Sequence, residues 1–311
     1  MVEETRKQIG MWLVVFVLIG TAFGGGYILA GISTEEGATA TTTALTIIDG
    51  IGRTVTIPYT PERIVSLASS ATETLYALGV GDRVVGVDAW SNYPSEVKDK
   101  PCVGSGSAPN IEMIIGLEPD VLFAWPYSRD AIISLEDKMP IVYIDPCSVD
   151  DVLDTIRMIG LVTGKTSEAE NLIAEMQSKI DTITEVTNVL NKTQRPLVYY
   201  ELGTPMKTTG PGTFTNELIF MAGGINLAAD EPIRYPILSS EYIIERNPDV
   251  IVIVSYGAPI EDVKNRDGWQ EINAVKNNRI YKIDTNLVTS NPRLVQGLEQ
   301  FAKWFHPDLF E

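Results

Sequence analysis

Two segments of the chain, 129 residues apart, repeat one pattern. Asn110 begins NIEMIIGLEPDVLFA and Ser239 begins SSEYIIERNPDVIVIV, and six residues are identical at that single offset. Each segment predicts a helix capped by Asn110 or Ser239 and ended near Pro119 or Pro248, because proline has no backbone N–H to continue a helix. A buried strand follows each proline. The repeat favours two related α/β lobes over a chance likeness of two common helix–strand units.

Around these segments, short apolar runs alternate with helical patterns. The expected strands are RIVSLA, RVVGVD, VLFAW and IVYID, and later LVYYEL, VIVIVS and RIYKID. This alternation is typical of parallel sheets with crossover helices. Ser167–Leu190 has apolar residues at helical spacing and predicts one long helix. We expect an N-terminal lobe over 45–163, a connecting helix within 164–194 and a C-terminal lobe over 195–311, with a ligand cleft between the lobes.

The N-terminal stretch Ile9–Ile32 has no charged residue in 24 positions, and basic residues precede it. Its length suits a membrane-spanning helix, and the basic flank predicts that the rest of the chain is exported. We expect residues 1–32 to be an uncleaved membrane anchor, with a cleaved signal segment as the alternative. No cysteine follows the run, so the expected anchor is not a lipid-modified cysteine. Residues 33–44 are small and polar and predict a flexible linker.

Composition argues for binding rather than catalysis. The net charge of −17 disfavours nucleic acid as a partner. The single histidine, His306, follows a predicted helix and is expected to cap it, which leaves no His-rich metal site and argues against a Ser-His-Asp triad. GPGTFTNE lacks the third glycine and the Lys-Ser/Thr of phosphate loops. Cys102 and Cys147 either form a disulfide or remain two separate thiols.

Five stretches resemble one family when they are taken together. They are RIVSLASSATETLYALGVGDRVVGVDAWSNYP, NIEMIIGLEPDVLFAW, GPGTFTNELIFMAGGINLA, SSEYIIERNPDVIVIV and NPRLVQGLEQFAKWFHPDLF. In this order they are similar to the Fe(III)-chelate and vitamin B12 periplasmic-binding proteins, over nearly all of 45–310. The resemblance implies a class III periplasmic-binding fold, an α/β architecture of two Rossmann-like lobes joined by one long helix. It also implies, as partners, an ABC permease dimer with its cytoplasmic ATPase.

The same resemblance assigns a docking role to two glutamates. In that family a Glu on each lobe pairs with arginines of the permease, and the matching residues are Glu73 in SSATETLYALG and Glu217 in TFTNELIFMAGG. We expect both in the first turn of a helix at a lobe surface, where a carboxylate can bind Arg through two hydrogen bonds. From the residues alone, Glu73 is equally explained by a capping box that starts at Ser70, and Glu217 by the preference for acids near helix N-termini.

Ligand-binding residues are expected at the carboxyl ends of the strands, where open parallel sheets bind their ligands. The candidates are Ser69, Trp90, Tyr93, Trp125, Tyr127, Tyr235, Tyr256 and Arg293. The resemblance matches Trp90, Trp125 and Tyr235 with aromatic residues of corrinoid binders, whereas a further pocket Trp of those proteins falls at Gly106. It also matches Arg293 with a siderophore-binding arginine. The alternative for each aromatic residue is packing in a lobe core.

The predicted function is therefore the extracytoplasmic substrate-binding component of an ABC importer. Its expected ligand is a metal chelate: a ferric siderophore, haem or a corrinoid. No cofactor or resident metal is expected, because the metal would arrive inside its own chelator. Two alternatives are an extracytoplasmic α/β hydrolase that uses Asp and Ser around the cleft, and a membrane-anchored sensor domain of the same fold without transport.

Overall fold

The computed structural model describes residues 15–19, 28–33 and 44–310. They form two compact units, each considered by itself below. Unit 1 contains the residues up to Ser69 together with 82–145 and 161–165, and unit 2 contains 70–81, 146–160 and 166–311. This division differs from the lobes predicted from the sequence, because 70–81 and 146–160 group with the C-terminal half of the chain.

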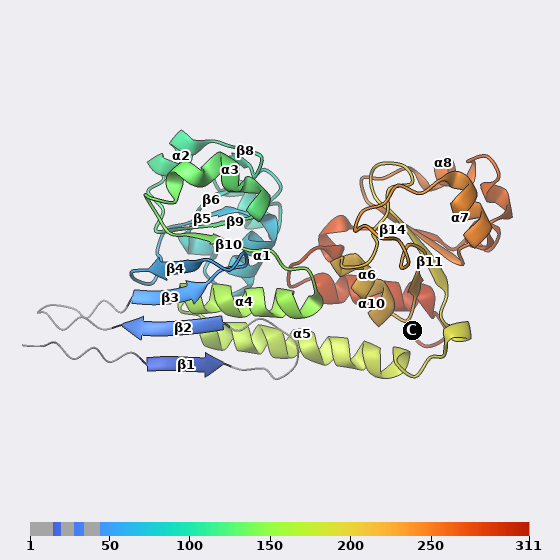
Figure 1. Cartoon of the computed structure of the whole chain (residues 1–311), viewed down its shortest axis with the longest axis horizontal. Helices are drawn as coiled ribbons and strands as arrows, with labels where there is room; N and C mark the ends of the chain where they lie inside the picture. The colour runs from blue at the N-terminus through green and yellow to red at the C-terminus, as the bar shows by residue number, and fades with distance from the viewer. Residues whose placement is uncertain (1–14, 20–27, 34–43, 311) are drawn as a thin grey trace, which may run out of the picture. The chain divides into compact units, whose positions relative to one another are not determined.

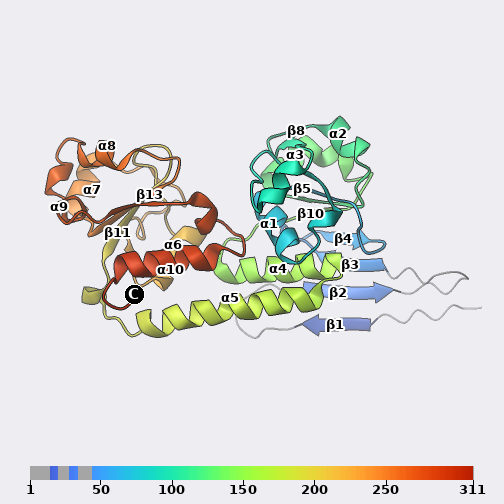
Figure 2. The same cartoon turned by 180° about the vertical axis from the view of Figure 1, so that it is seen from behind.

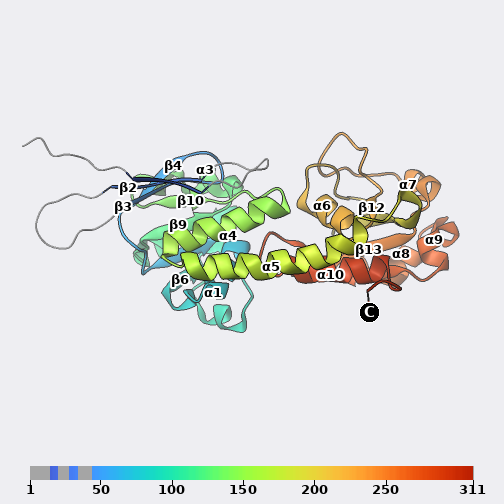
Figure 3. The same ribbon diagram turned by 90° about the horizontal axis from the view of Figure 1, so that it is seen from below.

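Each unit has a four-stranded parallel sheet, and the strands are labelled across Figures 1, 2 and 3. Unit 1 has the order β10-β9-β5-β6, and unit 2 has the order β12-β11-β13-β14. The strands of unit 1 are β5 (Ile64–Leu67), β6 (Val84–Val87), β9 (Val121–Ala124) and β10 (Ile141–Tyr143). Those of unit 2 are β11 (Leu197–Glu201), β12 (Ile225–Asn226), β13 (Val250–Val254) and β14 (Ile280–Ile283). The two orders are the same when the strands are matched in chain order, as the repeat predicts.

Ten α-helices lie among the described residues. They are α1 (Ser69–Ala77), α2 (Ile111–Gly116), α3 (Arg129–Ile132), α4 (Val149–Thr163), α5 (Thr166–Thr187), α6 (Phe214–Met221), α7 (Ser240–Arg246), α8 (Ile260–Lys264), α9 (Asn273–Lys276) and α10 (Leu294–Phe305). The predicted long helix is α5, which buries Ile173, Met176, Ile180 and Ile183 along one face. In Figure 3, α5 runs beside α10, against which it packs.

The described residues of the N-terminal stretch do not form the predicted helix. Instead of a helix, β1 (Val15–Ile19) and β2 (Ile28–Ser33) form an antiparallel pair. β2 also pairs with β3 (Ala44–Ile48), and β3 pairs with β4 (Thr54–Ile57), both antiparallel. Runs such as VFVLI are rich in β-branched and aromatic residues, which suit a strand as well as an apolar helix.

None of the helices in the described ranges is both long and apolar enough to cross a membrane. The other residues of the predicted anchor, and 34–43 of the predicted linker, lie outside the described residues.

The repeated segments fold alike in detail. The side chain of Asn110 accepts a hydrogen bond from the Met113 N–H at 3.0 Å, and that of Ser239 accepts one from Tyr242 at 3.1 Å. Both predicted N-caps are therefore confirmed. Each helix is followed by one residue in the left-handed region, at the same offset of 129: Glu118 has φ of 46° and Asn247 has φ of 50°.

The aspartate after each proline holds the start of the neighbouring strand. Asp120 Oδ2 accepts the Arg63 N–H at 2.8 Å, one residue before β5, and the Asp120 N–H donates to the Arg63 carbonyl at 2.8 Å. Asp249 makes the equivalent pair of bonds with Leu197, the first residue of β11, at 3.0 Å and 2.8 Å. Each aspartate thereby satisfies backbone groups at the strand entrance and aligns the two central strands of its sheet.

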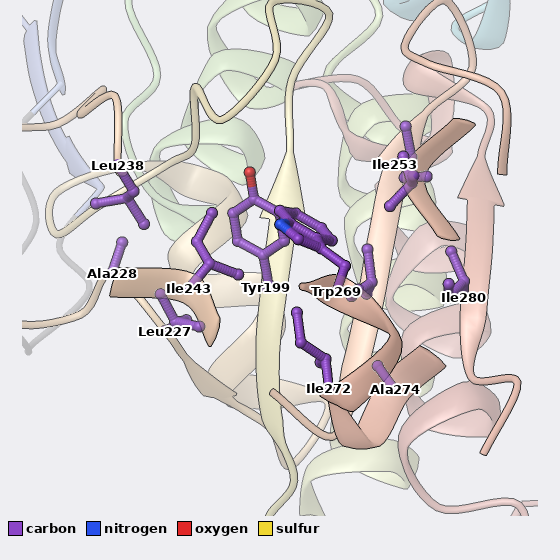
Figure 4. Packing of buried hydrophobic residues seen from close by; sticks show 12 residues of the cluster. Tyr199, Leu227, Ala228, Leu238, Ile243, Ile253, Trp269, Ile272, Ala274 and Ile280 are labelled. Atoms are coloured by element: carbon purple, nitrogen blue, oxygen red, sulfur yellow. The ribbon is translucent and has the colours of Figure 1, made fainter. Parts of the chain in front are cut away.

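The core of unit 2 is built around Trp269, which is fully buried (Figure 4). Its ring meets Tyr199 edge-to-face, with centroids 5.9 Å apart, and its indole N–H donates to Ser240 Oγ at 2.8 Å. Burying the indole therefore leaves no unsatisfied donor. The guanidinium of Arg266 lies over the Trp269 ring and forms a bidentate ion pair with the buried Glu201.

His306 is the C-cap residue of α10, as predicted. Its ring is buried, and Nε2 donates to the Gly223 carbonyl at 3.1 Å. Burial lowers the pKa of the imidazole from its ordinary value of 6.5, and the Gly223 contact only partly opposes this effect.

The chain should lose stability as pH falls below about 6.5, because the unfolded chain then binds a proton that folded His306 resists. Urea denaturation at pH about 7 and about 5.5 should show a smaller loss for His306→Gln than for the wild type. Glutamine can donate to the same carbonyl and has no charge to gain. An equal loss in the two proteins would show that His306 does not contribute to this pH dependence.

Candidate functional site

Four aromatic candidates lie in unit 1, after strands of its sheet. Trp90 and Tyr93 follow β6, and Trp125 and Tyr127 follow β9. Trp90 is 68% exposed and Tyr127 is 64% exposed, while Tyr93 is also exposed and Trp125 is half-buried. The rings of Trp125 and Tyr127 are stacked, with centroids 6.5 Å apart and 13° between their planes. Packing in the lobe core is therefore the wrong explanation for Trp90, Tyr93 and Tyr127.

Asp88, which the sequence reasoning did not identify, holds the loop that carries Trp90. Its buried carboxylate accepts hydrogen bonds from Ser91 Oγ and from the backbone N–H groups of Trp90 and Ser91. Burial raises the pKa of the Asp88 carboxyl, and these donors only partly offset the effect. The available signal was local, since an Asp side chain often bonds the backbone N–H two residues further on, here that of Trp90.

Tyr235 and Tyr256 are the exposed aromatic candidates of unit 2. Tyr235 lies in a segment that pairs with 206–210, through bonds such as Gly210 N–H to the Arg234 carbonyl at 2.8 Å. Ile233 and Ile237, two residues before and two residues after Tyr235, are exposed as well. Ile233 and Ile237 were missed, although the alternation in IRYPI was visible.

Arg293 is engaged within unit 2. Its Nε donates to Glu73 Oε2 at 2.7 Å and its Nη2 to Glu73 Oε1 at 2.8 Å. Asn291 Nδ2 also donates to Glu73, at 3.2 Å. This arrangement corrects two expectations. Glu73 lies one turn into α1, only 7% exposed, rather than on a surface, and the guanidinium predicted to meet a chelate already has a carboxylate partner.

The capping-box explanation of Glu73 is also wrong. Ser70 Oγ is buried and has no hydrogen-bond partner among the described residues, and the Glu73 carboxylate is directed to Arg293 instead. Burial raises the pKa of Glu73, although Arg293 acts in the opposite direction. Ser69, the candidate that begins α1, is half-buried.

Glu217 lies in the first turn of α6, as predicted, and is half-buried. Its Oε2 accepts the Val149 N–H at 2.7 Å, so the carboxylate caps α4. The alternative explanation, an acidic residue near a helix N-terminus, therefore holds for two helices. Glu217 lies in the first turn of α6, and its carboxylate also binds the first N–H of α4. Burial raises the pKa of this carboxyl, and the bond from Val149 opposes the shift. Glu73 and Glu217 both belong to unit 2, rather than one to each lobe.

No disulfide joins Cys102 and Cys147, which leaves two separate thiols. Cys102 is exposed, and Cys147 Sγ accepts a hydrogen bond from Arg234 Nη2 at 3.4 Å. Within the described part of the chain, no group of three or more His, Cys, Asp or Glu side chains is placed to hold a metal ion.

Comparison with known proteins identifies the class to which this fold belongs. The family described as "Periplasmic binding protein" matches residues 64–287. The chain is 36% identical to the uncharacterized ABC transporter substrate-binding lipoprotein YvrC of Bacillus subtilis, over 98% of this chain and 99% of that protein. It is 30% identical to the vitamin B12-binding protein of Pectobacterium carotovorum, over 78% of this chain and 87% of that protein.

Among solved structures, the periplasmic haem-binding protein RhuT of Roseiflexus sp. RS-1 matches with a TM-score of 0.70 and 29% identity. The match covers 79% of this chain and 98% of that one. The chain belongs to the periplasmic binding protein family. It has the class III fold and acts as an extracytoplasmic, non-enzymatic substrate-binding protein of an ABC transporter. The hydrolase alternative is therefore wrong.

The Glu73–Arg293 pair should contribute strongly to stability, because each side chain is mostly withdrawn from water. Removing one partner of a buried pair leaves an uncompensated charge, at a cost of about 3 kcal/mol or more. Glu73→Gln should therefore lower the free energy of unfolding by about that amount in urea titrations. Glu299→Gln is the control: it removes an exposed pair with Lys303, for which we expect a loss below about 0.5 kcal/mol. Equal losses would contradict a special role for the Glu73 pair.

Proposed function

We propose that this protein captures a metal chelate, either a ferric siderophore, haem or a corrinoid, and delivers it to an ABC permease. The observation that carries the proposal is the set of exposed aromatic rings after β6 and β9. Exposure of a large apolar ring to water is unfavourable, and a group of exposed rings often marks a binding site. A conjugated or apolar chelate covers such rings by stacking and by burial of apolar area.

The supply of metal-binding side chains also favours a chelated ligand over a bare ion. The chain has one histidine, whose ring is buried against the Gly223 carbonyl. A bare transition metal would need several nitrogen or sulfur donors in one place. The relatives named above for vitamin B12 and for haem are consistent with this choice, since both ligands carry their metal inside a macrocycle.

Titration of the intrinsic tryptophan fluorescence tests the ligand class. At least one of cyanocobalamin, haemin, a ferric hydroxamate and a ferric catecholate should quench the signal. Trp90→Ala should then weaken the binding of that chelate roughly tenfold, because one stacked ring and its buried area are lost.

Tyr59→Ala is the matched control for Trp90→Ala. Tyr59 is also an exposed aromatic residue of unit 1, but it bonds to Asp120, at the amino end of β9. Its replacement should leave affinity unchanged. The absence of quenching by all four chelates would contradict the proposal, and equal losses in the two variants would argue against ligand contact by Trp90.

Docking to the permease is proposed to use Glu217 and Glu73. Glu217 needs to give up only the Val149 N–H to accept a partner arginine. Glu73 would have to exchange Arg293 for the arginine of the partner. The anchored-sensor alternative predicts no such docking.

Glu217→Arg should abolish stimulation of the transporter ATPase in proteoliposomes and leave chelate affinity within about twofold, because like charges repel across the interface. Glu261→Arg is the control, since Glu261 also lies in the first turn of a unit 2 helix but is far more exposed. A fall in chelate affinity equal to the fall in stimulation would contradict a docking role for Glu217.

We further infer that the uncharged N-terminal stretch holds the protein at the extracytoplasmic face of the membrane. The YvrC relative is a lipoprotein, but the two cysteines of this chain lie within the two units, at 102 and 147. Attachment would therefore depend on the stretch itself. Recovery of the mature protein in the alkali-washed membrane fraction would support this attachment, and recovery in the supernatant would indicate cleavage.

A further inference from the structure

Tyr127 and Tyr256 occupy equivalent positions in the two units. They are separated by 129 residues, the offset that also relates the two N-caps, the two residues of positive φ and the two strand-entrance aspartates. Tyr127 follows β9 and Tyr256 follows β13, which are matched central strands of the two sheets. Both side chains are largely exposed, at 64% and 67%.

Each of these exposed rings rests on a glycine of its own unit. Gly106 lies in the turn between β7 (Gly104–Ser105) and β8 (Ala108–Pro109). A Cβ added at Gly106 would come within 2.8 Å of Cε2 and 3.0 Å of the hydroxyl oxygen of Tyr127, and within 2.6 Å of Ser128 Oγ. Gly203 lies after β11, and a Cβ there would be 2.6 Å from Cδ2 of Tyr256 and closer still to Cε2. Carbon atoms in contact normally lie at 3.5–4.0 Å.

Backbone conformation does not explain these two glycines. Neither has a positive φ, so an L-residue could adopt either backbone. What excludes a side chain is the Tyr256 ring at Gly203, and the Tyr127 ring together with Ser128 Oγ at Gly106. The atoms in contact lie along one edge of each ring, so that edge is confined against backbone while the rest of the side chain is largely exposed.

We propose that Gly106 and Gly203 are positioning residues, each of which fixes the tyrosine ring of its own unit, Tyr127 or Tyr256, as a contact for the chelate. The inference rests on the proposed function and adds the residues that set ring orientation. A fixed ring binds a flat ligand more tightly than a mobile ring, because less side-chain freedom is lost on binding. In unit 1 the Tyr127 ring is also held by stacking with the half-buried Trp125.

Gly203→Ala is the sharper variant, because only the Tyr256 ring need move and that ring can swing into solvent. We would label the full chain with 3-fluorotyrosine and assign the Tyr256 resonance in ¹⁹F NMR spectra from Tyr256→Phe. Gly203→Ala should shift and sharpen that resonance without ligand, while the unfolding midpoint changes little. Gly116→Ala is the control, because a Cβ at Gly116 meets no atom within 4 Å.

Haemin and cyanocobalamin are the probes for ligand affinity. Gly203→Ala should weaken whichever probe the wild type binds, roughly three- to tenfold. In the background of Tyr256→Ala the same change should have no further effect, because the glycine acts only through the ring. If Gly203 acted only through the stability of its loop, Gly203→Ala would lower chelate affinity further even in the Tyr256→Ala background.

The outcomes separate the inference from the proposed function. A resonance that does not move, or one that moves while affinity stays the same, overturns the role of Gly203. If Gly203→Ala fails to fold, Gly106→Ala and the Tyr127 resonance provide the same two readouts. A wild type that binds neither haemin nor cyanocobalamin overturns the ligand part of the inference. The proposed function itself fails only if the ferric siderophores also leave the tryptophan fluorescence unquenched.

Discussion

The carboxylates of Asp120 and Asp249 set the arrangement on which the rest of each unit depends. Each carboxylate accepts the backbone N–H of a residue at the start of the neighbouring central strand. The backbone N–H of the same aspartate donates to the carbonyl of that residue. This exchange aligns β9 with β5 and β13 with β11. Residues that leave the far ends of those strands, among them Tyr127 and Tyr256, therefore emerge at matching places. A bond at the amino end of a strand thus helps position a candidate ligand contact at its carboxyl end.

Local sequence predicted features whose cause is local. Asn110 and Ser239 could be recognised as caps because their partners lie three residues away. The Glu73–Arg293 pair could not be recognised, because its members are separated by 220 residues and Glu73 has a plausible partner nearby in Ser70. The strands in the N-terminal stretch were not predicted for another reason. An uncharged β-branched run satisfies the requirements of a membrane helix and of a strand, and composition alone does not choose between them.

The two acidic candidates differ in what docking would cost. Glu73 forms a bidentate ion pair in which both side chains are largely withdrawn from water, so a partner arginine must replace a charge. Glu217 accepts one neutral N–H at the start of a helix, which water or a side chain can replace at low cost. Glu217 is therefore the residue from which docking is easier to begin. An interface that reaches Glu73 would also release Arg293 and Asn291, both in the segment that precedes α10.

Ligand binding by the exposed rings also has a free-energy cost. An aromatic side chain in water usually samples several rotamers, and a ligand that stacks on it must bear the loss of that freedom. Gly106 and Gly203 remove much of this freedom beforehand by letting the rings lie against backbone. The position that resembles the pocket Trp of corrinoid binders is Gly106, and the Tyr127 ring fills the space that a side chain there would need. The proposed aromatic contact would then come from Tyr127, which follows β9. A residue-by-residue match to corrinoid binders would therefore overlook a surface of the same chemical kind.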